Sequence, residues 1–342
     1  MKRSRKKVSP VKPALDVEGA LRDLFINQPK LWLREARERL RDLPKSNFDL
    51  ACRFAKQGKW FDAVFRFRVV LFLRPDYPHA QYNLGGCYVR MGRPAEAKAA
   101  LLKALRQTPN DPDVAFMLAS IDPAALPAEQ RPKEMPEGMV TGFFGNIAEG
   151  YDVTEAGNKY QAGKVIHAFA QPLLTAPAPV IEDWACGSGI AARPWRAAAA
   201  RIHGVDVTPA MAALAQAATH VEKQLYEEVS VADIRALPDG MAGGKADLVL
   251  LINAAQFIGD LSAVMRAAAA ALRAGGLFIL TAEPIRAADG YGLVVETGRF
   301  GHAASYVQQV AVAAGLTLEK EATVELYAGV PAQAFAFRKG NH

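Results

Sequence analysis

The segment Val180-Ile-Glu-Asp-Trp-Ala-Cys-Gly-Ser-Gly189 places the strongest constraint on the fold of this chain. A short apolar run ends in an acidic residue, and the loop of small residues that follows predicts the start of a helix. A second apolar run, Ile202-His-Gly-Val-Asp206, ends in another acid 23 positions after Asp183. Small loop residues let the backbone approach a ligand closely, and a helix start offers free N–H groups. A carboxylate after the second strand can accept hydrogen bonds from both ribose hydroxyls. Together these features predict a nucleotide-binding site.

The composition of the loop indicates which nucleotide is bound. The dinucleotide fingerprint G-x-G-x-x-G and the phosphate loop ending in Gly-Lys-Ser/Thr are both absent, and no lysine stands near to hold a phosphate. Asp183-x-Ala-x-Gly-x-Gly189 instead resembles the first motif, Asp/Glu-x-Gly-x-Gly-x-Gly, of the S-adenosylmethionine-dependent class I methyltransferases. That cofactor has an adenosine and an amino acid but no phosphate. Ala185 stands where the family normally has its first glycine, and its methyl group either fits with slight rearrangement or narrows the cofactor site.

Two more segments resemble landmarks of this family. Phe144-Gly-Asn-Ile-Ala-Glu-Gly-Tyr-Asp152 is similar to the Phe-Asp-x-x-Ala-x-x-Tyr-Asp segment that precedes the catalytic fold in many small-molecule methyltransferases. The tyrosine of that segment, here Tyr151, lines the cofactor pocket in the family. Val231-Ala-Asp-Ile234 follows a predicted third strand, where the family uses an aspartate, here Asp233, to meet the adenine amino group.

Two apolar segments complete the order of landmarks. Residues Ala246 to Asn253 predict a buried fourth strand, and Leu272 to Leu280 predict a helix end, a turn and a fifth strand. The resemblance implies a Rossmann-like α/β domain with a seven-stranded, mostly parallel sheet in the order 3-2-1-4-5-7-6 and an antiparallel seventh strand near Ala332 to Phe337. It also implies S-adenosyl-L-methionine as cofactor, bound by ten residues: Tyr151, Asp183, Ala185, Gly187, Gly189, Asp206, Val207, Asp233, Ile234 and Asn253.

The chain before this domain repeats itself with a period of 34 positions. Matched positions carry similar residues in the two copies: Leu50 and Leu84, Ala63 and Ala97, Pro75 and Pro109. Period and positions resemble the tetratricopeptide repeat, a helix–turn–helix unit in which small residues lie where the helices cross and proline ends the second helix. We predict repeats at 44–77 and 78–111, followed by one capping helix at 112–121.

Length and composition agree with two domains. A chain of 342 residues exceeds what one hydrophobic core usually serves. We expect a basic disordered tail at 1–13, a helical repeat domain at 14–121, a proline-rich linker or irregular strap at 122–137 and the methyltransferase domain at 138–342. Within the repeat domain, residues 15–25 and 31–43 have helical apolar spacing and are expected to pack on the repeats.

Charge and cysteine content bear on partners and location. The net charge of +6 is matched by six basic residues before Pro13, so the remainder of the chain is balanced. A neutral body argues against a nucleic-acid substrate, whereas the tail either solubilises the chain or contacts a partner or anionic surface. No apolar run is long enough to span a membrane, and the N-terminal residues lack a secretory signal. The three cysteines are scattered without zinc-site spacing, so we expect reduced thiols in a cytoplasm and no metal.

One position of the predicted repeats is aromatic in every copy: Phe48, Tyr82 and Phe116, each 34 positions apart. Repeats that clamp a peptide carboxylate present Lys and Asn in this groove, which these positions do not. Aromatic groove residues instead favour apolar contact. Either a partner helix or another part of this chain is expected to supply that contact.

The sequence predicts the catalytic residues less well than the cofactor residues. Methyl transfer is a displacement on an already activated cofactor, so the protein chiefly aligns the acceptor, excludes water and, for some acceptors, removes a proton. Residues 297–306 differ from the apolar helices around them and supply three candidates. His302 would act as a general base or orient the acceptor, aided by Arg299 and Tyr306; alternatively, His302 makes only a local hydrogen bond, or the enzyme needs no base.

Residues 257–261 and 297–306 together resemble a bacterial group of predicted methyltransferases with N-terminal tetratricopeptide repeats. That resemblance implies a reaction class but no particular acceptor. We expect methyl transfer to a small molecule at a hydroxyl or carboxylate, with the repeats serving docking. Two alternatives remain: a protein acceptor recruited by the repeats, and a non-catalytic binding protein that has kept the fold.

Overall fold

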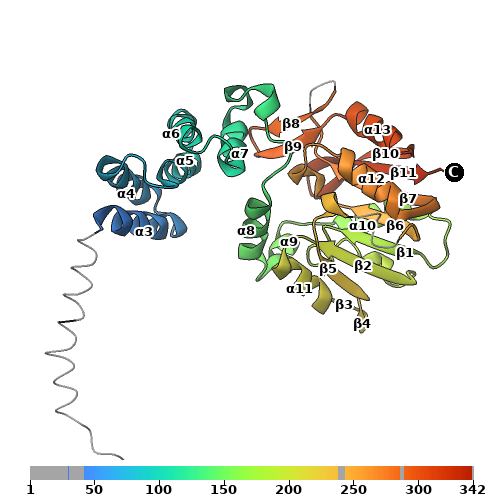
Figure 1. Ribbon diagram of the computed structural model, residues 1–342. Coiled ribbons are helices and arrows are strands. Elements are labelled where there is room, and N and C mark those ends of the chain that lie inside the picture. The colour runs from blue at the N-terminus through green and yellow to red at the C-terminus, as the bar shows by residue number, and fades with distance from the viewer. Residues whose placement is uncertain (1–29, 31–41, 238–242, 286–288, 341–342) are drawn as a thin grey trace, which may run out of the picture. The chain divides into compact units, whose positions relative to one another are not determined.

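The computed structural model describes residues 30, 42–237, 243–285 and 289–340. The chain divides into two compact units, Met1–Gln107 and Thr108–His342 (Figure 1). The expectations for the basic tail at 1–13 and for a helix at 15–25 lie outside the described residues, as does the helix expected at 31–43 up to residue 41. Among the residues that are described, no helix has the length and apolarity needed to cross a membrane.

The first unit consists of two helix–turn–helix pairs at the predicted repeats. The helices are α3 (Leu43–Lys56), α4 (Trp60–Leu73), α5 (Ala80–Arg90) and α6 (Pro94–Gln107). The matched residues Ala63 and Ala97 are fully buried, as the repeat pattern predicts for helix crossings. A Cβ atom on Gly85 would lie 2.7 Å from Cγ of Leu101, so α5 approaches α6 too closely for any side chain there. The predicted repeat architecture is confirmed.

Phe48 in α3 is half-buried and contacts two aromatic residues of the first unit. Its ring centroid is 5.6 Å from that of Phe67 in α4 and 5.1 Å from that of Tyr77. Residues of the chain itself therefore cover part of this side chain, and the predicted contact with a partner helix stays a prediction.

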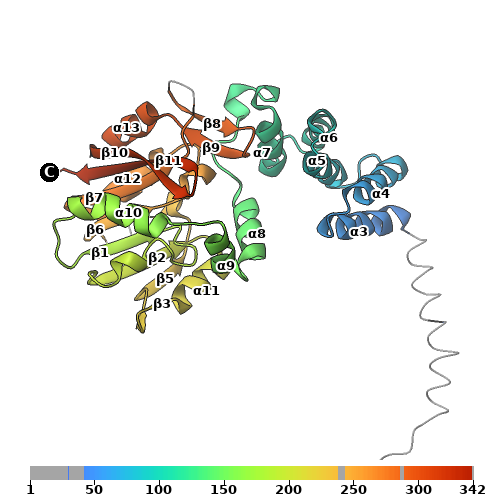
Figure 2. The same ribbon diagram turned by 180° about the vertical axis from the view of Figure 1, so that it is seen from behind.

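The second unit is built on a seven-stranded sheet (Figure 2). Its strands in chain order are β1 (Val180–Trp184), β2 (Arg201–Asp206), β5 (Glu228–Val231), β6 (Ala246–Leu251), β7 (Leu272–Ala282), β10 (Leu316–Tyr327) and β11 (Val330–Lys339). They lie in the order β10-β11-β7-β6-β1-β2-β5, and only β11 runs antiparallel to both of its neighbours. Counted along the chain this is 3-2-1-4-5-7-6 with an antiparallel seventh strand, which confirms the predicted topology.

Helices cover both faces of the sheet. One hydrophobic cluster packs α12 (Ser262–Ala271) and α13 (Ala304–Ala313) on one face, and a second cluster packs α10 (Ala162–Ala170) and α11 (Pro209–Ala217) on the other. Alternate residues of each strand enter the two clusters, as the period of two in a strand requires. All six residues of β6 are buried, as expected for a central parallel strand. Figures 1 and 2 show α12 and α10 on opposite sides of this sheet.

The helix predicted directly after the small-residue loop is the one element of this region that the sequence mispredicts. Between the loop and β2 the structure contains the short 3-10 helix η5 (Arg193–Trp195) instead. Pro194 explains the difference, because in the interior of a helix that began at the loop it would remove a hydrogen bond and clash with the preceding turn. The loop therefore offers its own backbone to a ligand, without a long helix behind it.

The proline-rich segment forms an ordered strap on the second unit. Two 3-10 helices, η2 (Pro123–Ala125) and η3 (Ala128–Gln130), precede a stretch that is bonded to the loop after β6. The N–H of Met135 donates to the carbonyl of Phe257 over 2.9 Å, and the N–H of Gly259 donates to the carbonyl of Lys133 over 2.8 Å. The segment was expected to be either a linker or an irregular strap, and these hydrogen bonds agree with the strap.

The helix at 112–121 groups with the second unit. This helix, α7 (Pro112–Ile121), contacts the hairpin of β8 (Tyr291–Val294) and β9 (Arg299–His302). The ring of Phe116 lies 6.0 Å from the ring of Phe300, centroid to centroid, and both side chains are buried. The compact division falls after Gln107, so this helix, which the repeat spacing predicts as the capping helix, lies in the second compact unit. Phe116, the third aromatic residue of the predicted groove, therefore packs within the second unit.

A candidate cofactor and acceptor site

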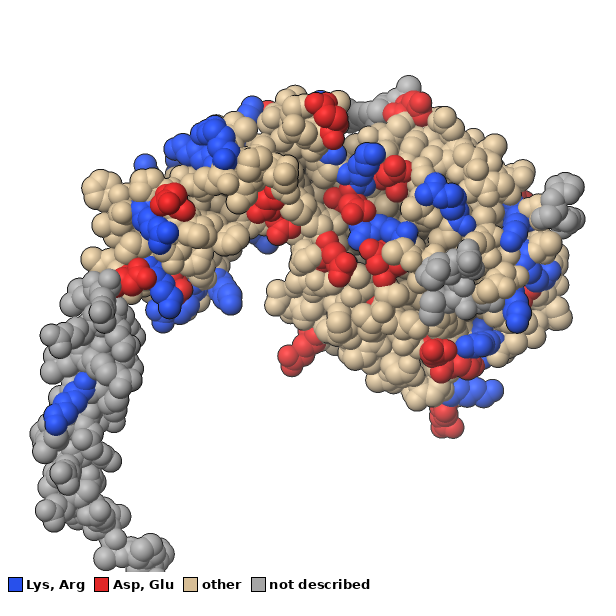
Figure 3. Space-filling view, viewed as in Figure 1, with Lys and Arg blue, Asp and Glu red and all other residues tan. Residues whose placement is uncertain are grey.

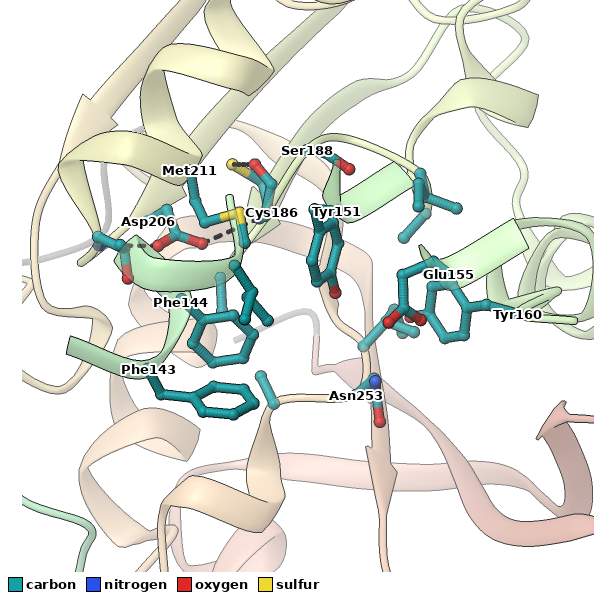
Figure 4. A pocket seen from close by; sticks show the side chains of 18 of the residues that line it. Phe143, Phe144, Tyr151, Glu155, Tyr160, Cys186, Ser188, Asp206, Met211 and Asn253 are labelled. Atoms are coloured by element: carbon teal, nitrogen blue, oxygen red, sulfur yellow. Dashed lines mark hydrogen bonds between the residues drawn. The ribbon is translucent and has the colours of Figure 1, made fainter. Parts of the chain in front are cut away.

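A cavity of about 800 Å³ opens at the carboxyl ends of β1, β2 and β6 (Figure 4). It is covered by α8 (Glu137–Ile147) and α9 (Tyr151–Gly157), which contribute Phe144 and Tyr151 to its wall. Seven of the ten predicted cofactor residues line it: Tyr151, Asp183, Ala185, Gly187, Asp206, Val207 and Asn253. Asp233 and Ile234 line a smaller adjoining cavity of about 70 Å³. The structure thus gathers residues that lie more than 100 positions apart in the sequence.

Two non-glycine residues of the cavity wall have left-handed backbone conformations. Ala185 has φ +52° and Asn253 has φ +56°. Asparagine tolerates this region, but an alanine there costs about 1–2 kcal/mol relative to its usual conformations. The conformation explains why the corresponding position of the family motif is a glycine. The methyl group of Ala185 is accommodated, at a cost in backbone strain.

Gly189, the remaining predicted cofactor residue, does not line either cavity. Its φ is +90°, and a Cβ atom there would lie 2.5 Å from Cδ2 of Leu225 and 2.9 Å from the ring of Tyr226. A glycine is required at this position because the loop packs directly on these two side chains. Its place in the motif is therefore explained by packing below the loop.

Asp206 is held at the cavity wall by the backbone. Its Oδ2 accepts the N–H of Gly187 over 2.9 Å, and its Oδ1 accepts the N–H of Thr208 over 2.8 Å. Burial raises the pKa of Asp206, and these two hydrogen bonds oppose that rise. Each oxygen keeps a further lone pair, so the carboxylate is fixed in place and still able to accept two vicinal hydroxyls.

Asp183 lies deeper, beneath the loop. It is 1% exposed and accepts a hydrogen bond of 2.6 Å from Oη of Tyr226. Burial raises the pKa of Asp183 to about 7, although the hydrogen bond from Tyr226 favours the charged form. This side chain supports the loop from below through Tyr226, and its carboxyl group titrates near neutral pH.

The smaller cavity has apolar walls with a charged rim. Val207, Ile234 and Phe257 contribute apolar surface, and Asp233 lies at the edge. Both carboxylate oxygens of Asp233 accept from Nε of Arg235, at 2.8 and 2.9 Å. An apolar slot beside a fixed acceptor suits the face and the amino group of a purine. Arg235 was not anticipated from the sequence, although it lies only two residues beyond Asp233.

The three catalytic candidates lie in two different environments. Arg299 is exposed and lines both the large cavity and an adjoining cavity of about 320 Å³, which also includes Glu283 and Thr297. The side chains of His302 and Tyr306 line neither of these cavities. Arg299 is thus the candidate that the structure brings to the site.

His302 and Tyr306 instead stabilise the loop after β6. Nε2 of His302 lies 2.9 Å from the carbonyl oxygen of Ile258, and Oη of Tyr306 accepts the N–H of Leu261 over 3.0 Å. Burial lowers the pKa of His302, which is 3% exposed. These contacts favour the alternative in which His302 makes only a local hydrogen bond. They do not favour a role as general base, because the side chain lines neither cavity.

Sequence reasoning missed many residues of the cavity wall, among them Glu155, Tyr160 and Tyr327. Oη of Tyr327 donates to Oε2 of Glu155 over 2.7 Å and accepts from Nδ2 of Asn253 over 3.3 Å. Glu155 follows Tyr151 by four positions on α9, so helical spacing from the motif tyrosine could have identified it. Tyr327 lies at the far end of the sequence and carries no local signal.

Charged residues provide no single-signed surface on the face seen in Figure 3. On the second unit, Lys and Arg side chains lie among Asp and Glu side chains there. Around the large cavity itself, Arg299 is the single basic residue among the described residues of the wall. Such a wall suits a ligand without phosphate groups.

Family models match both units. Residues 183–280 match the methyltransferase domain, and residues 54–121 match the tetratricopeptide repeat. A search of the curated proteins finds no significant match.

Several solved structures are similar to the chain at low sequence identity. Magnesium protoporphyrin IX methyltransferase from Synechocystis PCC 6803, with bound S-adenosylmethionine, is 16% identical over 60% of this chain and 97% of its own, with a TM-score of 0.46. The same enzyme with bound S-adenosylhomocysteine is 16% identical over 60% and 99% of the two chains, with a TM-score of 0.48. The 1,6-didemethyltoxoflavin-N1-methyltransferase from Burkholderia thailandensis is 16% identical over 61% and 92%, with a TM-score of 0.46.

The strand order, the motif loop at the ends of β1 and β2 and the two family models agree with one another. The chain thus contains a methyltransferase domain with the class I strand order and, on the N-terminal side of it, tetratricopeptide repeats.

Proposed function

We propose that the second unit transfers a methyl group from S-adenosylmethionine to a small molecule, at a hydroxyl or carboxylate oxygen. The observation that carries this proposal is one continuous cavity of about 800 Å³ that reaches from the motif loop to Arg299. Pockets for small ligands usually measure about 300–1,000 Å³. The cavity is therefore large enough for a cofactor and a small acceptor side by side.

The cofactor end of the cavity is assigned by its donors and acceptors. Asp206 would accept the two ribose hydroxyls, and the adenine would lie across the apolar slot beside Asp233 and the adjoining wall of the large cavity, which share Ala185 and Val207. The backbone of the loop around Ala185 and the turn at Asn253 would hold the methionine end. When bound, this cofactor supplies a methyl group on an activated sulfur, so the chain needs to provide alignment and the exclusion of water.

The acceptor end is assigned by Arg299. Its guanidinium lies at the junction of the large cavity and the 320 Å³ cavity that contains Glu283. Burial raises the pKa of Glu283, and the charge of Arg299 opposes that rise, so the two groups interact across this cavity. A guanidinium in this position can bind a carboxylate or another anionic group of the acceptor in bidentate fashion and orient the oxygen that receives the methyl group.

Two measurements test the proposal with the full chain. Calorimetric titration should show binding of S-adenosylmethionine, and a folded chain that does not bind it would refute the assignment. Incubation of cell extract with cofactor labelled in its methyl group should then place the label in the small-molecule fraction. Label found in proteins would contradict the small-molecule acceptor and indicate recruitment by the repeats.

A further inference from the structure

Glu155 is a buried carboxylate that lines the large cavity without a cationic partner. The residue is 7% exposed, and among the described residues no basic side chain forms an ion pair with it. Its Oε2 accepts the hydroxyl of Tyr327, whereas Oε1 has no hydrogen-bond partner in the described part of the chain. A buried carboxylate in this state is costly unless a ligand brings compensating charge.

Three tyrosines surround this carboxylate. Tyr151 and Tyr160 lie on either side of Glu155 in Figure 4, and the ring of Tyr160 is 4.7 Å from that of Tyr327, centroid to centroid. Burial, together with the charge of Glu155, raises the pKa of all three phenols, so they remain neutral. A carboxylate among neutral aromatic rings attracts a compact cation both by its charge and through the ring faces.

The position of this cluster relative to the cofactor follows from its contacts. Tyr327 joins Glu155 to Asn253, which lies in the turn after β6 at the methionine end of the proposed cofactor site. Tyr151, the motif tyrosine, contributes its ring to the same wall. The cluster therefore faces the end of the cofactor where the methyl group is transferred, away from the ribose at Asp206.

We propose that Glu155, with Tyr151, Tyr160 and Tyr327, binds the positive charge of the cofactor sulfonium and makes the site prefer the charged cofactor to its neutral product. This inference rests on the proposed function. During transfer the acceptor lone pair forms the new bond to the methyl carbon, and the electron pair of the broken S–C bond stays on sulfur. The sulfur becomes an uncharged thioether, so Glu155 loses its partner and the affinity for the product falls.

The test compares two ligands that differ only in the substitution and charge of the sulfur. S-Adenosylmethionine and S-adenosylhomocysteine share the adenosine, the amino group and the carboxylate, and differ in the methyl group and the charge on sulfur. In calorimetric titrations of the full chain, Glu155→Gln should weaken binding of S-adenosylmethionine about tenfold and leave S-adenosylhomocysteine within about twofold. Glutamine keeps the acceptor for Tyr327 while removing the charge.

A matched control comes from Glu325, an exposed carboxylate on β10 two positions before Tyr327 that lines none of the described cavities. Glu325→Gln should leave both affinities unchanged. Equal weakening of both ligands by Glu155→Gln would overturn the inference and assign Glu155 to the cofactor amino group, which both ligands carry. Unchanged affinities with reduced turnover would also overturn it and place Glu155 at the acceptor.

A wild-type chain that binds neither ligand would refute the proposed function itself, so the two failures are distinguishable. If Glu155→Gln does not melt as a folded protein, Tyr327→Phe supplies the second variant. This variant removes the hydroxyl that donates a hydrogen bond to Glu155. It keeps the negative charge of Glu155 and the aromatic ring at position 327. The preference for the charged cofactor should then be kept or widened, and a narrowed preference would overturn the inference.

Discussion

Asp206 shows at the scale of one residue how the fold prepares a polar ligand site. Two backbone N–H groups hold its carboxylate at 2.8 and 2.9 Å. Asp206→Ala should therefore weaken cofactor binding by about 2–4 kcal/mol, because it removes a pair of charge-assisted hydrogen bonds to the ribose. Calorimetry on a variant whose melting confirms that it is folded would check this. Unchanged affinity would remove Asp206 from the ribose site.

Ala185 tests whether the strained loop limits the site. Because its φ of +52° is unfavourable for alanine and easy for glycine, Ala185→Gly should leave the folded loop unstrained and stabilise the chain by up to about 1 kcal/mol. Cofactor affinity should be kept or tightened, which thermal melting and calorimetry would measure together. A tenfold loss of affinity would show instead that the loop depends on the methyl group.

Asp183 makes stability depend on pH. Its pKa in the folded chain is raised to about 7, above its ordinary value near 3.8, so the folded state binds the extra proton between these limits. The contribution of this proton to the free energy of unfolding is fully present below about pH 4 and is lost as the pH rises through 7.

The matching measurement compares the wild type with Asp183→Asn by denaturant unfolding at several pH values. The wild type should lose stability relative to the variant between pH 4 and 7, with a slope of at most about 1.4 kcal/mol per pH unit. The other acids titrate alike in both chains and cancel in the difference. A difference that does not change with pH would show that Asp183 stays ionised throughout.

The sequence predicts the residues of this site unevenly, for a physical reason. Asp206 ends one buried strand and Asn253 follows another, and such positions can be found from local apolar runs. Glu155 and Tyr327 act as a pair across 172 positions, and their contact exists only because α9 and the end of β10 meet at the cavity. Arg299 was found by its unusual surroundings in the sequence, but the same reasoning could not separate it from His302.

At the scale of elements, the strands and the helix at 112–121 were predictable, and the helix after the small-residue loop was not. Each buried strand has its own apolar run, and the family resemblance orders the strands correctly. The prediction of a helix after the loop is wrong because Pro194 lies where the interior of that helix would be. The helix at 112–121 has the right repeat spacing, yet it groups with the other unit, because repeat periodicity predicts that Phe116 is apolar without identifying what covers it.

Phe116 accordingly belongs to the stability of the second unit. It is 4% exposed and packs on Phe300, next to Arg299 on β9. Phe116→Ala should lower the stability of this unit by about 3–5 kcal/mol through the lost apolar burial and the cavity left behind. Thermal melting would show a lower melting temperature for the transition of the second unit, which is the transition that S-adenosylmethionine shifts to higher temperature. Phe48→Ala, the same truncation within the first unit, is the control and should leave that transition in place.

At the scale of the whole molecule, the question is which part of the chain makes an independent methyltransferase. The seven strands, the cavity and the strap all lie after Thr108. The sequence assigns the methyltransferase domain to residues 138–342. The strap before residue 138 also contributes to the site, because Met135 lines the small cavity and its N–H donates to the carbonyl of Phe257.

A chain of residues 108–342 should therefore melt cooperatively and bind S-adenosylmethionine within a few-fold of the full chain. A chain of residues 138–342 should bind it more weakly and melt earlier, because it lacks both α7 and the strap that closes the adenine slot. Calorimetry and melting of the two truncations beside the full chain would decide. If residues 108–342 fold cooperatively but do not bind the cofactor, the repeats form part of the active site; if they bind it and methylate only small acceptors, the repeats deliver larger ones.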